Sequence, residues 1–78
     1  MPYVLPQHRD PKGDHNRRLA LGVGPEAFAA EAGVTPEDLR QYELTSPDQE
    51  FDLAVARRVG DALERLEANP PPTQKVVN

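Results

Sequence analysis

The clearest pattern along the chain is a helical repeat of apolar residues in its last third. Between residues 51 and 66 apolar side chains recur every three or four positions, namely Phe51, Val55, Val59, Ala62, Leu63 and Leu66. Such a stripe is the face that a helix buries against its neighbours. Ser46, Pro47 and Gln49 fit a capped helix start, and the prolines at 70–72 end the helix. The pattern therefore predicts one long helix that forms the centre of the core.

Residues 24–33 predict a short helix with a small apolar face. The face consists of Phe28, Ala29 and Ala32, and Pro25 stands at the helix start. Gly33 suits the left-handed backbone conformation that ends many helices. We expect the chain to turn sharply at this glycine.

A second short helix is expected directly after the turn, over residues 36–43. Thr35 fits the N-cap and Pro36 the first helical position. Acidic residues fill the first turn, where the helix dipole favours negative charge. Leu39 and Tyr42 are the positions that this helix would bury. Two short helices that meet at a glycine indicate a helix-turn-helix.

The two ends of the chain show no helical periodicity. Residues 1–14 contain three prolines and predict an extended or disordered arm. A brief first helix is expected over residues 17–21, capped by Asp14 or Asn16. Residues 70–78 predict a proline-rich disordered tail. No segment reads as a strand, so the expected fold is all-α: a small four-helix helix-turn-helix domain over residues 15–69, with a flexible arm and tail.

Composition narrows the class of protein. The chain of 78 residues has no Cys and no Trp, and 37% of its residues are hydrophobic. Disulfides and thiolate metal sites are excluded, which is typical of a cytoplasmic protein. No apolar run is long enough to span a bilayer, so no membrane partner is expected.

The charges are distributed unevenly. Residues 1–20 carry four basic and two acidic residues, a net charge of +2, whereas residues 26–67 carry four basic and eleven acidic residues, a net charge of −7. Attraction for phosphate groups should therefore come mainly from the N-terminal segment, which carries Arg9, Lys12, Arg17 and Arg18, helped by Arg40.

The sequence AFAAEAGVTPEDLRQYE, followed by a helix with VARRVGDAL, resembles the phage-repressor/Cro-type (XRE-like) helix-turn-helix superfamily. The resemblance covers roughly residues 16–67 and rests on Ala29, Gly33, Val34, Thr35, Leu39, Tyr42 and Glu43, with Val55, Val59 and Leu63 in the next helix. The segment AGVTPEDLRQYE is also similar to the start of MerR-type winged helix domains. The wing that should follow is missing from residues 45–52.

The repressor resemblance implies a lambda-repressor-like fold and a small DNA-binding regulator that acts as a homodimer. The helix at about 36–43 would enter the major groove of double-stranded DNA. Its contacts would come from Thr35, Glu37, Arg40 and Gln41, with Arg17 and Arg18 on phosphates. The sequence departs from the family in its short first helix and in Pro36, which has no base-reading donor or acceptor.

The acidic character of the body leaves a second function open. An antitoxin-like or adaptor-like interaction module, with reduced or no DNA binding, would fold its two tails onto a protein partner. A dimerisation scaffold built on residues 51–66 is a third alternative. We expect no enzyme, no cofactor and no metal site, because the chain lacks a nucleophile arrangement or a phosphate-binding loop. His8 and His15 do not have a recognised ligand spacing.

Overall fold

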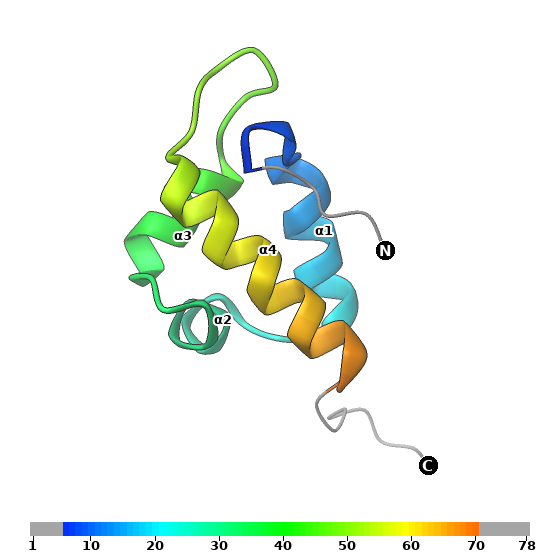
Figure 1. The fold of residues 1–78 in the computed structure, drawn as a ribbon. Helices are drawn as coiled ribbons and strands as arrows, with labels where there is room; N and C mark the ends of the chain where they lie inside the picture. Colours follow the sequence, from blue (N-terminus) through cyan, green and yellow to red (C-terminus); the bar gives the residue numbers. More distant parts are fainter. Residues whose placement is uncertain (1–5, 71–78) are drawn as a thin grey trace.

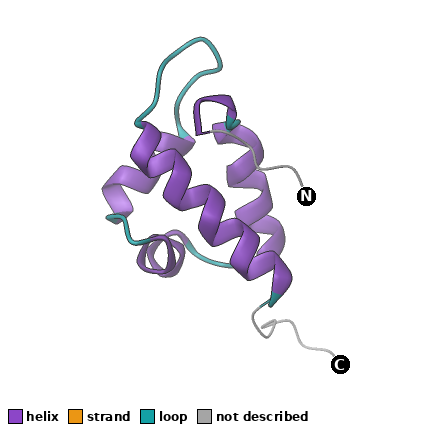
Figure 2. Cartoon of the chain, viewed as in Figure 1, coloured by secondary structure: helices purple, strands orange, loops and turns teal. Residues whose placement is uncertain are grey.

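The computed structural model describes residues 6–70 (Figure 1). A short 3-10 turn η1 (Pro6–His8) leads into four helices, α1 (Pro11–Leu21), α2 (Pro25–Ala32), α3 (Pro36–Glu43) and α4 (Leu53–Ala68). Helices and loops account for all of this part of the chain, with no strand among residues 6–70 (Figure 2). The prediction of an all-α four-helix domain is confirmed. The outer parts of the predicted arm and tail, residues 1–5 and 71–78, lie outside the described residues.

Helix α4 is the central element of the fold. It runs diagonally across Figure 1, with α1 on one side and with α2 and α3 on the other, and it contacts all three helices. Its buried residues include Val55, Val59 and Leu63, and they meet Phe28 of α2 and Leu39 of α3. The predicted apolar stripe is therefore the core face of this helix. In the part of the chain that the structure describes, no helix combines the length and the apolar character needed to cross a membrane.

Helices α2 and α3 form the predicted helix-turn-helix. Gly33 ends α2 with a φ of 78°, and the Val34 amide donates to the carbonyl oxygen of Ala29 at 3.0 Å. The Thr35 hydroxyl accepts a hydrogen bond from the Asp38 amide at 3.0 Å, which caps α3. Figure 1 views α2 almost along its axis while α3 lies across the view, so the two helices cross steeply.

The start of α4 differs from the prediction. The helix begins at Leu53, where the Asp52 carboxylate accepts from the amides of Ala54 and Val55. Ser46 begins a tight turn instead, in which the Gln49 amide donates to the Ser46 carbonyl oxygen at 2.9 Å. Phe51 lies before the helix and packs edge-on against Tyr42, with ring centroids 5.3 Å apart. This aromatic contact, which no local pattern reveals, favours the later helix start.

The first helix also begins earlier than predicted, at Pro11, so that η1 and the start of α1 occupy residues expected to form an extended arm. Asp14, one of the predicted caps, lies inside α1 and is buried, and its carboxylate binds Arg9 and Tyr42. These hydrogen bonds, of which the one to Tyr42 joins residues 28 positions apart, stabilise a helix in a segment whose own sequence gives little helical tendency.

Candidate functional site

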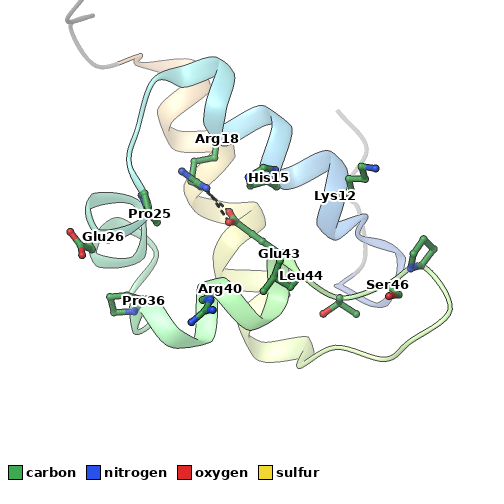
Figure 3. Close-up of a pocket in the computed structure, with 12 residues that line it drawn as sticks. Lys12, His15, Arg18, Pro25, Glu26, Pro36, Arg40, Glu43, Leu44 and Ser46 are labelled. Carbon is green, nitrogen blue, oxygen red and sulfur yellow. Dashed lines mark hydrogen bonds and ion pairs between the residues drawn. The ribbon is translucent and has the colours of Figure 1, made fainter.

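A groove of about 590 Å³ lies on the side of the molecule that carries the outer part of α3 (Figure 3). Lys12 and His15 of α1 border it on one side, and Pro36 and Arg40 of α3 border it on the other. The start of α2 and the loop after α3 close its two ends. The groove therefore lies between α1 and one side of the helix that the sequence predicts to contact DNA.

The floor of this groove is an ion pair between α1 and α3. Arg18 Nε donates to Glu43 Oε2 at 2.8 Å, and Nη2 donates to Oε1 at 3.0 Å (Figure 3). Arg18 Nη1 also donates to the Val23 carbonyl oxygen at 2.9 Å. The side chains of Arg18 and Glu43 are only 7% and 9% exposed. Arg18, expected from sequence to bind phosphate, thus joins α1 to α3 and leaves the floor of the groove neutral.

A second polar network lies one turn earlier on α1. Asp14 accepts two hydrogen bonds from Arg9, at 2.8 Å and 2.7 Å, and one from the Tyr42 hydroxyl at 2.6 Å. Burial, and then the hydrogen bond to Asp14, hold the pKa of Tyr42 well above its usual value of 10.0. The hydrogen bonds that Arg9 donates to Asp14 raise the pKa of Arg9. Asp14 and Arg18 therefore fix the consecutive residues Tyr42 and Glu43 in the last turn of α3.

Gly60 of α4 gives the Arg9 guanidinium its space. A Cβ at this position would lie 2.7 Å from Arg9 Nη1. Sequence reasoning missed this network, because it joins residues from four parts of the chain. Gly60 was the residue in the sequence that could have indicated this network. A glycine inside a helix lowers its stability by about 1 kcal/mol relative to alanine, so its presence suggests that another group packs closely against that position.

Arg17 lies away from the groove. Its guanidinium donates two hydrogen bonds to the Glu67 carboxylate, at 2.9 Å and 2.6 Å, and thereby joins α1 to the end of α4. These hydrogen bonds lower the pKa of Glu67 and raise that of Arg17. Arg17, predicted to contact phosphate, is not among the residues that line the groove beside Arg40.

The other predicted contact residues lie on the exposed side of α3. Glu37, Arg40 and Gln41 are all exposed, and Gln41 Nε2 donates to Glu37 Oε2 at 3.0 Å. Thr35 is exposed too, although its hydroxyl already caps the helix. Within residues 6–70 the side chains of Arg40 and Lys12 have no hydrogen-bond or ion-pair partner, so both cations are available to a ligand in the groove.

The opposite flank of α3 is acidic. A smaller groove of about 230 Å³ runs beside it and is lined by the carboxylates of Asp38, Glu50 and Asp52. Helix α3 thus separates a flank with two available cations and one exposed carboxylate, that of Glu26, from a flank with three acidic residues. A phosphate backbone would be attracted to the first flank and repelled by the second.

Among residues 6–70 no group of three or more His, Asp or Glu side chains is placed to hold a metal ion. Comparisons of the chain with protein-family models, with curated proteins and with solved structures give no significant match. The geometry around α3 is therefore what bears on function.

Proposed function

We propose that this protein is a small DNA-binding transcriptional regulator of the phage-repressor/Cro type, in which α3 enters the major groove. One observation carries the proposal. The helix-turn-helix leaves the outer side of α3 free of packing, and the available cations Lys12 and Arg40 border the groove beside it. Exposed helices flanked by cations are how many such domains approach a duplex.

In this proposal the contact residues have distinct roles. Lys12 and Arg40 bind the phosphates of one strand, while Glu37 and Gln41 face base edges. The Thr35 hydroxyl can donate to a phosphate while its oxygen caps α3. Arg17 and Arg18 act indirectly, because they hold α1 against α4 and α3. As a cytoplasmic homodimer the protein would read two half-sites about one helical turn apart.

Fluorescence anisotropy tests the proposal directly. The full chain is titrated into a fluorescein-labelled pool of randomised duplexes at low salt, with Arg40→Ala and Lys12→Ala beside the wild type. Arg57→Ala is the matched control, because Arg57 is also an exposed arginine but lies on α4 and outside the groove. We expect salt-sensitive binding that the first two variants weaken and the control does not. Absent binding, or equal effects of Arg40→Ala and Arg57→Ala, would overturn the proposal.

One observation favours protein interaction as the second candidate function. Leu44, which directly follows α3 and lines the groove, is a large apolar side chain that is 70% exposed. A photo-crosslinking amino acid at position 44 tests this alternative in cells. A protein captured from position 44, but not from position 57, would support it. Partner binding through the tails concerns mainly residues outside the described part of the chain.

A further inference from the structure

The outermost ridge of α3 is formed by Glu37 and Gln41. The core side of this helix carries Leu39 and Tyr42, and the helical repeat places Glu37 almost directly opposite them. Gln41 follows one turn later on the same ridge, and both side chains are exposed. A ridge in this position is the part of a helix that reaches deepest into a major groove.

The hydrogen bond between the two side chains determines which polar atoms the ridge offers to a ligand. Gln41 Nε2 donates to Glu37 Oε2 at 3.0 Å, which orients the carboxylate and leaves Oε1 without a partner among the described residues. An ionised carboxylate only accepts hydrogen bonds. Arg40 lines the groove that Lys12 also borders. The ridge therefore offers an acceptor at its first turn, and the neighbouring Arg40, three residues after Glu37, lies on the side of α3 that faces the groove.

We propose that Glu37, braced by Gln41, reads the N4 amino group of a cytosine in the major groove. This inference rests on the proposed function and names the base that the same surface selects. Cytosine presents a donor at the major-groove edge, whereas guanine presents two acceptors that repel a carboxylate. Adenine also has an amino group, but its N7 acceptor lies beside it, and thymine presents an acceptor and a methyl group. Cytosine is thus the base whose edge suits a lone carboxylate.

Two features reduce the cost of bringing this carboxylate near DNA. Glu37 lies in the first turn of α3, where the helix dipole favours a negative charge. Arg40 lies one turn later and, with Lys12, provides the attraction for the backbone of one strand. The carboxylate can therefore act in selection while the flanking cations provide affinity.

Selection from a pool of duplexes with ten randomised base pairs tests the inference, followed by titration of single duplexes that differ at one base pair. The wild type should enrich cytosine at one position of each half-site, and replacing that base pair should weaken binding about tenfold. Glu37→Gln should shift the preference to adenine, since a glutamine amide can pair with N6 and N7 together. Asp38→Asn is the matched control, because it removes the same charge from the same turn but lies on the acidic flank. It should keep the cytosine preference.

The possible outcomes separate this inference from the proposed function. Binding without an enriched cytosine, or an unchanged tenfold preference in Glu37→Gln, overturns the inference and leaves DNA binding intact. A shift of preference in Asp38→Asn as large as in Glu37→Gln overturns it too, because the effect would then come from charge alone. Absence of binding to any duplex overturns both proposals. Circular dichroism of each variant shows that an altered preference does not come from unfolding.

Discussion

Tyr42 belongs to the hydrophobic core and to a polar network at the same time. Its ring is 2% exposed and packs against Phe51, while its hydroxyl donates to Asp14 at 2.6 Å. We expect Tyr42→Phe to lower the free energy of unfolding by about 1.5–3 kcal/mol, because a hydrogen bond to a charged acceptor is lost. The loss should lie near the lower end, since Arg9 still pairs with the carboxylate. Urea denaturation measures it, and an unchanged midpoint would contradict this account.

Because of the same hydroxyl, the free energy of unfolding should fall as the pH rises into the alkaline range. Because burial and Asp14 raise the pKa of Tyr42 above its unfolded value of 10.0, the folded state favours the protonated phenol. This contribution is fully present below about pH 10 and is lost as the pH rises further. Urea titrations from pH 8 to pH 11 should show a steeper loss of stability in the wild type than in Tyr42→Phe. Equal slopes would mean that the phenol does not titrate as the structure implies.

Gly60 and Gly13 should respond in opposite ways to the same substitution. A Cβ on Gly60 would press on Arg9, which Asp14 holds in place, and overpacking of this kind costs about 1–3 kcal/mol. A Cβ on Gly13 would meet only the exposed Asp10 side chain, which can swing away. Thermal unfolding should therefore show Gly60→Ala less stable than the wild type. Gly13→Ala should be more stable by up to about 1 kcal/mol, since alanine favours helix.

At the scale of elements, the sequence predicts structure well where the signals are local. Gly33, Thr35 and Pro36 act on neighbouring amides, so α2, the turn and α3 lie where the pattern places them. The same cap chemistry at Ser46 gives a turn instead of a helix, because the position of Phe51 is decided by its contact with Tyr42. Local chemistry limits where a helix can start, and tertiary contacts select among those places.

In the candidate site, too, the features set by local sequence were predictable and those set by tertiary contacts were not. Helical periodicity alone places Glu37, Arg40 and Gln41 on the exposed side of α3. It gives no access to the partners of Arg17 and Arg18, which are 50 and 25 residues away. A basic pair in the sequence reads as free charge, and only the fold shows that both side chains bind carboxylates.

Arg18 and Glu43 form a buried ion pair between α1 and α3. Removing one partner should destabilise the fold strongly, whereas replacing both with apolar residues should not. Glu43→Ala leaves the Arg18 guanidinium uncompensated, and we expect a loss of about 3–5 kcal/mol of stability. The double variant Arg18→Met/Glu43→Leu should recover most of it, because a buried ion pair can often be replaced by apolar packing. Urea denaturation of both variants measures the difference. A double variant as unstable as the single one would show that the pair itself is indispensable.

At the scale of the whole molecule, charge limits how DNA could be bound. The chain has a net charge of −4, and the cations that the groove makes available are Lys12 and Arg40. With two phosphates neutralised per domain, the logarithm of the binding constant should fall against the logarithm of salt concentration with a slope of about −2 per domain. Anisotropy titrations at several salt concentrations measure this slope. A value near −4 per domain would mean that Arg17 and Arg18 leave their partners to contact phosphate.

The attachment of α1 to α4 also bears on how the protein is made. Arg17 binds Glu67, and Arg9 fits against Gly60, so the attachment of the first helix to α4 depends on residues that the ribosome adds after α1, α2 and α3. A chain synthesised only as far as α3 can pair Asp14 and Arg18 with Tyr42 and Glu43, but it lacks every contact with α4. Domains whose stabilising contacts join distant residues fold only once both segments are available. Completion of this fold must therefore wait until α4 has left the ribosome exit tunnel.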